Sequence, residues 1–226
     1  MPDRLEYTVT AAVWFVVIIV NYHATERKRM GYLFCLMGKS SSGKDTVYRR
    51  LLADSRLKLH RLVTGTTRPI REGERDGEEY YFYTDEQFRR LQKDGGIIEC
   101  RSYDTVYGIW NYFTAVYSEL DIEKRDYLTI NTLEAYVKLR DYFGTDRLVP
   151  VYLEVDDGLR LQRALDRERA QLQPRYKELC RRFLADEEDF SKENLERAHI
   201  DPIFQNVVLD ETVKRVAAYI SSIQNR

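Results

Sequence analysis

Hydrophobic positions along the chain alternate between short apolar runs and longer stretches with helical spacing. The runs at residues 32–37, 127–130 and 148–155 have the length of single buried strands. The stretches that follow two of them, at 132–143 and 157–169, repeat their apolar residues every three or four positions, as one face of a helix does. Strands that alternate with helices predict a parallel sheet covered by helices on both faces. The pattern therefore predicts an α/β fold.

Residues 58–101 interrupt this pattern with shorter elements and many turn residues. Strands are expected at 58–63, 80–83 and 97–101, and the stretch 68–79 contains Pro69, Gly73 and Gly77, which favour a loop. Between the last two strands, a helix from a capping box at Thr84 and Gln87 to Lys93 is predicted. This segment is therefore expected to form a small region inserted into the α/β core.

The last part of the chain returns to alternating elements. The sequence predicts a strand over Phe204–Leu209 and a closing helix over Glu211–Gln224. The inward face of that helix is expected to carry Val213, Val216, Ala217 and Ile220. Before this helix, residues 160–182 are rich in Arg and Glu and contain one Pro, which suits a mobile element. A solvent-facing helix pair explains most of these charges equally well.

Residues 1–29 differ from the rest because Ala11–Val20 is wholly apolar and a polar stretch follows it. The apolar run is short for a membrane span, which needs about 20 residues, and it lacks the basic start of a secretory signal. Three interpretations remain: translation that truly starts at Met30, a weak membrane anchor, or an additional packed helix. We favour the first, and we expect residues 30–226 to form the functional domain.

Composition excludes several classes of function. The chain has 226 residues, 43% of them hydrophobic and 32% charged, with a formal net charge of −1, which is typical of a folded globular protein. Near-zero charge provides no general attraction for nucleic acid or an acidic membrane, so neither is expected as a partner. Cys35, Cys100 and Cys180 lack metal-ligand spacing, and an odd number of separated thiols is typical of a cytoplasmic protein.

Residues 38–46 read Gly-Lys-Ser-Ser-Ser-Gly-Lys-Asp-Thr and stand between a predicted strand and a predicted helix. Glycines at both ends let the backbone N–H groups point inward, the helix dipole attracts anions, and Lys44 adds a charge. This context predicts a phosphate-binding loop. The loop residues expected to contact phosphate groups or their metal ion are Gly38, Lys39, Ser40, Ser41, Ser42, Gly43, Lys44, Asp45 and Thr46.

A second group of polar residues follows in the inserted region. Arg68 and Arg71 flank Pro69, and two guanidinium groups on a stiff turn suit a second phosphate. Tyr80 and Tyr107 add hydroxyl groups, and Glu99 ends an apolar strand. An ordinary salt-bridged loop is an equally good interpretation of the spacing alone.

The stretch Thr64-Gly-Thr-Thr-Arg-Pro-Ile-Arg-Glu-Gly-Glu-Arg-Asp-Gly-Glu-Glu-Tyr-Tyr-Phe82 closely resembles the nucleotide-binding motif of guanylate kinases. The phosphate loop precedes it at that family's distance, and Ile97-Ile-Glu99 and Val106-Tyr-Gly108 follow where expected. The resemblance implies a P-loop core with a parallel sheet, a small antiparallel GMP-binding region over residues 64–109 and a helical lid over residues 160–190. It also implies transfer of the ATP γ-phosphoryl group to GMP or dGMP with Mg²⁺, in purine nucleotide metabolism.

The resemblance assigns roles residue by residue. Glu99 matches the carboxylate that reads guanine, and Thr64 matches a hydroxyl residue near the guanine carbonyl. Arg182 matches a lid arginine on the path of the phosphoryl group, Arg167 or Arg169 replaces another, and Asn206 matches a residue near adenine. The groups expected to hold the GMP phosphate are Arg68, Arg71, Tyr80 and Tyr107.

Four positions depart from the family pattern. Asp45 replaces the hydroxyl residue that meets Mg²⁺, although Thr46 offers a hydroxyl next to it. Ile109 replaces a hydroxyl residue of the guanine pocket, and Thr129 and Asn131 replace two acidic residues near the metal, the second of which also approaches guanine. Asp45 and Thr46 are therefore our candidate metal ligands, and Asn131 is a candidate substrate contact.

Two alternatives remain at this point. Ribose 1,5-bisphosphate phosphokinases resemble this chain in Gly-Lys-Asp and in an Asn at the position of Asn131, but they lack the run from Arg71 to Phe82. Guanylate-kinase-like domains of scaffold proteins resemble it in the acceptor region, but their phosphate loops have lost the residues that Gly38, Gly43 and Lys44 represent here. We therefore expect an ATP-dependent kinase that acts on GMP.

Overall fold

A computed structural model describes residues 31–71, 73–105, 108–116 and 121–226. The predictions for residues 1–29 and for Tyr107 lie outside these ranges. Within the described part, no helix combines the length and the apolar character that a membrane crossing requires.

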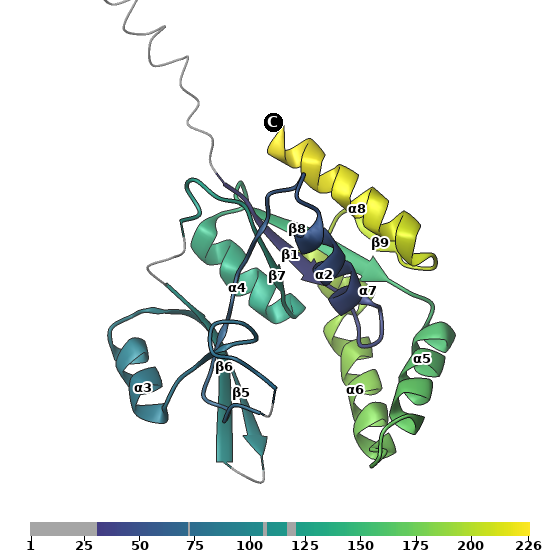
Figure 1. The fold of residues 1–226 in the computed structure, drawn as a ribbon, viewed down its shortest axis with the longest axis horizontal. Helices are drawn as coiled ribbons and strands as arrows, with labels where there is room; N and C mark the ends of the chain where they lie inside the picture. The colour runs from purple at the N-terminus through teal and green to yellow at the C-terminus, as the bar shows by residue number, and fades with distance from the viewer. Residues whose placement is uncertain (1–30, 72, 106–107, 117–120) are drawn as a thin grey trace, which may run out of the picture. The chain divides into compact units, whose positions relative to one another are not determined.

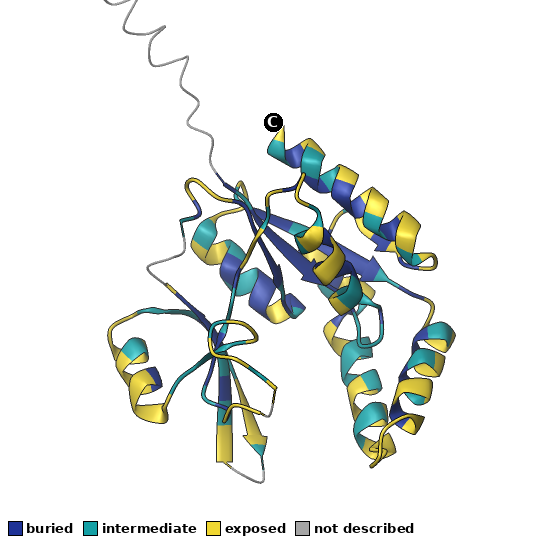
Figure 2. Cartoon of the chain, in the orientation of Figure 1, coloured by how far each residue is buried: buried dark blue, intermediate teal, exposed yellow. Residues whose placement is uncertain are grey.

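Five parallel strands form the main sheet, in the order β2 (His60–Arg61), β7 (Tyr127–Ile130), β1 (Leu33–Met37), β8 (Leu148–Glu154) and β9 (Ile203–Gln205). Figure 2 shows the central strands as buried along their length. Every residue of β1 is inaccessible to solvent, because this strand lies in the middle of the sheet with helices on both faces.

Alternate residues of β1 pack against different helices, as the two-residue repeat of a strand requires. Phe34 and Leu36 pack in the cluster that contains α2 (Lys44–Ala53) and α8 (Leu209–Gln224). Leu33, Cys35 and Met37 pack in the cluster that contains α4 (Leu133–Phe143) and α7 (Lys192–Arg197). The main sheet is therefore the middle layer of three (Figure 1).

A second sheet contains β4 (Tyr81–Phe82), β3 (Gly65–Thr66), β6 (Gly108–Ala115) and β5 (Ile97–Thr105), in that order. The pairs β3–β6 and β5–β6 are antiparallel, whereas β3 and β4 are parallel. Helix α3 (Asp85–Lys93) packs on this sheet through Phe88, which contacts the ring of Phe113 with centroids 5.1 Å apart. The predicted capping box of α3 is present.

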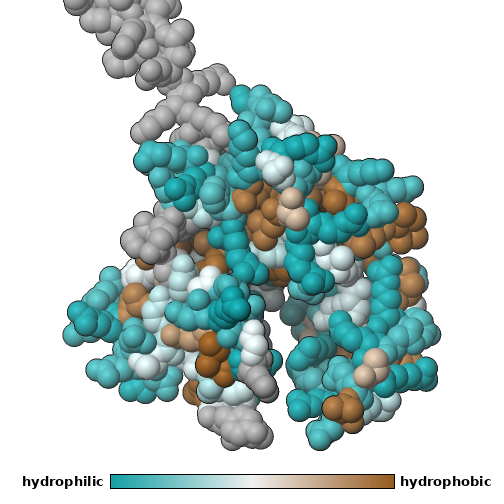
Figure 3. Space-filling model, in the orientation of Figure 1, coloured by the Kyte–Doolittle hydropathy of each residue, from teal (hydrophilic) through white to brown (hydrophobic). Residues whose placement is uncertain are grey.

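Helices α5 (Asp157–Arg169) and α6 (Tyr176–Asp189) form the predicted helical lid region. Most of their surface is exposed or half-buried (Figure 2). Figure 3 shows the surface hollowed between this helix pair and the second sheet, with largely hydrophilic walls.

The predicted α/β fold class is confirmed, and several element boundaries change. The strand expected at 58–63 is limited to His60–Arg61, and β6 was not predicted. The strand predicted over Phe204–Leu209 is wrong beyond Gln205, because the chain turns there and α8 already begins at Leu209. The inward face of α8 contains Val216, Ala217 and Ile220 as predicted, while Val213 is half-buried.

Candidate functional site

The predicted phosphate loop connects β1 to α2, and its backbone is held by close contacts. Gly43 has a φ angle of 85°, and a Cβ atom at this residue would lie 2.6 Å from the side-chain nitrogen of Asn206. That nitrogen donates a 2.7 Å hydrogen bond to the carbonyl oxygen of Ser42. The hydroxyl groups of Ser41 and Ser42 are buried and have no hydrogen-bond partner among the described residues. Unpartnered donors in a loop at a helix N-terminus fit a phosphate group.

Lys44 lies at the start of α2 and is half-buried. Burial lowers the pKa of its ammonium group, and the charges of Asp45 and Asp186 oppose this shift. Asp45 is exposed in the first turn of α2, and Thr46 beside it is half-buried. The Lys44 ammonium group therefore follows directly after the phosphate loop, and the charges of Asp45 and Asp186 act on it.

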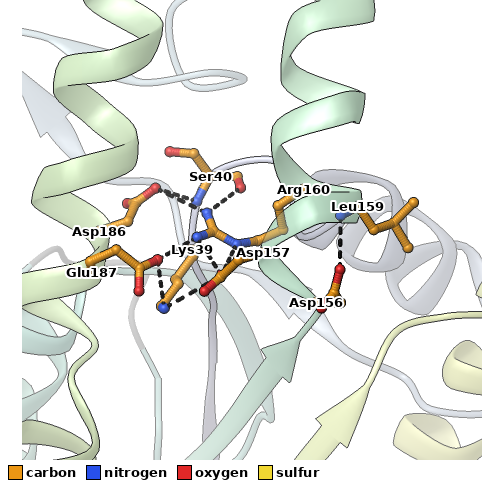
Figure 4. Close-up of polar contacts among 8 residues, drawn as sticks. All are labelled: Lys39, Ser40, Asp156, Asp157, Leu159, Arg160, Asp186 and Glu187. Carbon is orange, nitrogen blue, oxygen red and sulfur yellow. Dashed lines mark hydrogen bonds and ion pairs between the residues drawn. The ribbon is translucent and has the colours of Figure 1, made fainter.

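Side chains from the lid helices contact the other end of the loop (Figure 4). The backbone N–H of Ser40 donates a 2.7 Å hydrogen bond to the Asp186 carboxylate. The carbonyl oxygen of Ser40 accepts a 3.2 Å bond from Nη1 of Arg160. Lys39 donates to the Glu187 carboxylate at 2.7 Å. Residues of α5 and α6 thus hold the backbone N–H and the carbonyl oxygen of one loop residue, Ser40.

Arg160 is the centre of this contact and only 1% of its surface is exposed. Its guanidinium group lies 2.8 Å from the Asp157 carboxylate and 2.5 Å from that of Glu187. The guanidinium also lies over the ring of Phe183, 4.6 Å from its centroid. Burial of this charge is compensated by paired carboxylates, as burial of an ion requires.

A cavity of about 600 Å³ lies between α5 and α6 and extends to Ser40. Arg160, Arg167 and Arg182 are among its lining residues, whereas Arg169 is not. Arg182 donates to the Glu178 carboxylate at 2.8 Å. The cavity therefore extends from Ser40 of the phosphate loop to both Arg167 and Arg182.

Arg68 of the predicted acceptor site is 3% exposed and forms two hydrogen bonds with Glu74, of 3.0 and 2.8 Å. Its guanidinium carbon also lies 5.5 Å from the centroid of the Tyr80 ring. Arg71 is exposed and its guanidinium has no ion-pair partner among the described residues, although its backbone N–H donates to Glu74. Tyr80 is half-buried, and burial raises the pKa of its hydroxyl group. Arg68, Arg71 and Tyr80 thus belong to one loop region, as predicted from sequence.

The predicted guanine reader, Glu99, lies on β5 with no exposed side-chain surface. Its Oε1 atom accepts a 2.9 Å hydrogen bond from the hydroxyl of Thr114. Its Oε2 atom lies 3.3 Å from Nε of Arg101, an ion pair whose orientation does not make a hydrogen bond. Thr64, the other candidate guanine contact, is half-buried just before β3.

Thr129 and Asn131 stand on and just after β7, at the carboxyl end of the sheet, and both are buried. The hydroxyl of Thr129 donates a 2.8 Å bond to Oδ1 of Asn131. The Nδ2 atom of Asn131 is buried and has no hydrogen-bond partner among the described residues. The amide therefore offers a donor to a ligand at this position.

The sequence did not single out Arg101, Arg160, Asp186 or Glu187. One signal for Arg160 was present: Arg160, Ala164 and Glu168 recur every four residues and form the buried face of α5. A charged residue on an inward-facing helical repeat indicates a buried ion pair. Asp186 and Glu187 carried no such signal, because their contacts with Ser40 and Lys39 join residues more than 140 positions apart in sequence.

Comparisons with known proteins agree with this architecture. A family model described as guanylate kinase matches residues 30–223. The guanylate kinase of Porphyromonas gingivalis is 32% identical over 128 residues, which cover 55% of this chain and 65% of that protein. The guanylate kinase of Parasynechococcus marenigrum is 44% identical over 70 residues, which cover 31% of this chain and 38% of that protein. The chain thus spans less than two thirds of the length of these curated relatives.

A solved structure supports the same fold. The crystal structure of guanylate kinase from Anaplasma phagocytophilum aligns with a TM-score of 0.59 at 23% identity, covering 88% of this chain and 89% of that one. The family model covers nearly all of the described residues. The chain therefore belongs to the guanylate kinase family.

Proposed function

We propose that this protein is an ATP-dependent guanylate kinase that transfers the γ-phosphoryl group of ATP to GMP or dGMP. The observation that carries the proposal is the phosphate loop. Lys44 and the buried, unpartnered hydroxyls of Ser41 and Ser42 are groups there that can bind an anion. Family membership and the curated relatives, which are guanylate kinases, support GMP as the acceptor.

In the proposed reaction, an oxygen of the GMP phosphate attacks the γ-phosphorus of ATP. A new P–O bond forms to GMP, the bond to the bridging oxygen breaks, and ADP leaves with that electron pair. The acceptor is already an anion, so the reaction needs positioning and neutralisation of charge more than a general base. Lys44 and the loop N–H groups would hold the ATP phosphates, Arg182 with Arg167 or Arg169 would meet the transferring group, and Asn206 would lie near adenine.

The acceptor phosphate would bind to Arg68, Arg71 and Tyr80, with Tyr107 as a further predicted contact. Two guanidinium forks suit the geometry of a phosphate. Thr64, Glu99 and Asn131 would then face the base. Movement of α5 and α6 toward the substrates would exclude water and suppress hydrolysis of ATP.

The residues at the loop fit Mg²⁺. A carboxylate, Asp45, adjoins a hydroxyl, Thr46, and hard oxygen ligands of this kind suit the ion. Among the described residues, no group of three or more His, Cys, Asp or Glu side chains is arranged so that it could hold a metal ion. Mg²⁺ is commonly bound by one or two protein oxygens together with phosphates and water. When bound, the ion would neutralise charge on the β- and γ-phosphates. We expect Asp45→Ala to abolish magnesium-dependent turnover while GMP binding stays largely intact.

Two other functions receive less support. Ribose 1,5-bisphosphate phosphorylation would agree with Asp45 and Asn131, but the curated relatives are guanylate kinases. A non-catalytic binding module would not require the intact loop geometry at Gly43 and Lys44. We further propose a cytoplasmic location, in agreement with three free cysteines far apart in the sequence.

A direct assay tests the proposal. Purified protein with ATP and Mg²⁺ is offered GMP, dGMP, AMP or ribose 1,5-bisphosphate, and ADP release is followed. We expect turnover with GMP and dGMP, and loss of turnover in Lys44→Ala. Turnover with the sugar bisphosphate alone, or none with any acceptor, would contradict it.

A further inference from the structure

A β-bulge stands beside Glu99 on β5. The pairing of β5 with β6 places Ile97 opposite Ala115 and Glu99 opposite Thr114, so β5 contains one extra residue between these two pairs. A bulge of this kind redirects the side chain beside it, and bulges are frequent next to active sites. The strand pairing thus brings the Glu99 side chain, which has no exposed surface, next to that of Thr114.

The two oxygens of the Glu99 carboxylate have different surroundings. Oε1 accepts a 2.9 Å hydrogen bond from the hydroxyl of Thr114, which is fully buried. Oε2 is also buried, and it has no hydrogen-bond partner among the described residues. Most buried acceptors in folded proteins have a donor, so an unpartnered one needs an explanation. A ligand that donates to Oε2 would provide it.

Arg101 provides the positive charge beside this carboxylate. It lies two residues further along β5, on the same face of the strand, and its Nε atom is 3.3 Å from Oε2 of Glu99. This ion pair does not make a hydrogen bond, so Oε2 keeps its capacity to accept one. Nη1 of Arg101 donates to the hydroxyl of Thr132, 3.5 Å away, at the N-cap of α4. The guanidinium group is thus anchored on the core and compensates the charge of a buried acid, as burial requires.

The charge of a carboxyl group decides which purine edge it can match. An ionised carboxylate offers only acceptors, and these match the N1–H and 2-amino donors of guanine. A neutral acid or an amide offers one donor and one acceptor, which match N1 and the 6-amino group of adenine. A cation fixed beside Glu99 therefore favours guanine over adenine.

We propose that Thr114 and Arg101 are positioning residues for Glu99 and so determine specificity for guanine. This inference rests on the proposed function, in which Glu99 faces the base. Thr114 fixes the orientation of the carboxylate through Oε1, and Arg101 compensates its charge. Oε2 and the remaining lone pair of Oε1 are then left for the two donors of guanine.

The test measures dissociation constants of GMP and AMP by calorimetry on the full chain without ATP. In Thr114→Val we expect GMP binding to weaken by about tenfold and AMP binding to change less than about twofold, because a hydrogen bond to a charged group is lost. Thr114→Ser keeps the hydroxyl and should restore GMP binding to within about threefold of the wild type. Arg101→Met should weaken GMP binding by about tenfold or more and leave AMP binding unchanged or tighter.

Arg89→Met is the matched control, because Arg89 is an exposed arginine on α3 in the same inserted region. Its dissociation constants for both nucleotides should stay within about twofold of the wild type. A residue with a purely structural role affects GMP and AMP binding alike. The ratio of the two constants therefore separates a positioning role from a loss of structure.

Three results overturn the inference. They are equal weakening of GMP and AMP binding in Thr114→Val and Arg101→Met, unchanged GMP binding in both variants, and wild-type binding of AMP as tight as that of GMP. Circular dichroism shows whether each variant is folded, and the comparison of Thr114→Val with Thr114→Ser decides alone if Arg101→Met is not. Selective binding of GMP without ADP release in the presence of ATP would contradict the proposed kinase activity and leave this inference standing.

Discussion

The Asp186 carboxylate lies 2.7 Å from the backbone nitrogen of Ser40, so an acidic residue of α6 accepts a hydrogen bond from the phosphate loop. Its negative charge also raises the pKa of Lys44, against the effect of burial. Loop N–H groups and this lysine are the groups that bind phosphates in a P-loop. Asp186 therefore occupies a loop N–H group that we expect a triphosphate to bind, and we expect ATP binding to release this contact.

We expect Asp186→Asn to bind ATP about threefold to tenfold more tightly, because removing a nearby like charge is worth about 1 kcal/mol at a partly exposed site. Calorimetric titration of the nucleotide-free protein with ATP measures the effect. Glu188→Gln removes the same charge from an exposed position of α6 without a loop contact in the described structure, and it is the matched control. An equal rise in ATP affinity in both variants, or no rise in Asp186→Asn, would show that the Ser40 contact does not compete with phosphate.

Arg160 is expected to contribute to stability more than any exposed ion pair of the lid. Arg160→Ala leaves Asp157, Asp186 and Glu187 without their shared cation. Loss of one partner of a buried pair typically costs about 3–5 kcal/mol. Because the carboxylates here are partly exposed, we expect a cost of about 3 kcal/mol in the free energy of unfolding. Urea denaturation should show that fall in the free energy of unfolding, partly recovered in Arg160→Lys. Gln162→Ala, an exposed change on the same helix, should have little effect.

The parts of the fold that were predictable depend on local signals. The strand β1, the loop after it and helix α2 were all recognisable, because an apolar run, two glycines and a helical repeat adjoin one another. The strand β6 was not, since Gly108–Ala115 has mixed burial and gains its order from pairing with β5. The error at Phe204–Leu209 has a similar cause: Val207 and Val208 are exposed although their type favours a strand.

The candidate site likewise contains residues that a local motif predicted and contacts that only the tertiary structure shows. Arg68 and Tyr80 were predicted from a contiguous motif, and they lie together. The ion pairs of Arg68 with Glu74 and of Arg101 with Glu99 depend on side-chain rotamers, which sequence spacing does not determine. Contacts between the lid and the loop join residues more than 100 positions apart, so tertiary structure alone reveals them.

The binding of ATP should depend on pH through Lys44. Burial lowers the pKa of this lysine below its ordinary value of 10.5, and Asp45 is the largest opposing influence. Lysine is charged below its pKa, so affinity for ATP should be lost as pH rises through the lowered value. Asp45→Asn removes the opposing charge and should move this loss to a lower pH.

Dissociation constants for ATP between pH 7 and about pH 10.5 measure the position of this loss. Asp85→Asn is the control, because Asp85 is an exposed acid in the first turn of α3, as Asp45 is in α2. A profile that is unchanged in Asp45→Asn would contradict the coupling between these two residues.

Arg68→Lys should raise the KM for GMP by about tenfold to a hundredfold and leave the KM for ATP nearly unchanged. A lysine provides a point charge where the arginine fork makes two parallel bonds, and it cannot reproduce the contacts of 3.0 and 2.8 Å with Glu74. Arg75→Lys is the matched control in the same loop, since Arg75 is exposed and its ion pair with Glu78 is at the surface. Steady-state kinetics with each substrate varied in turn separate the two constants. If the KM for ATP rose as much as that for GMP, Arg68 would be a general support of the fold and not a contact of the acceptor phosphate.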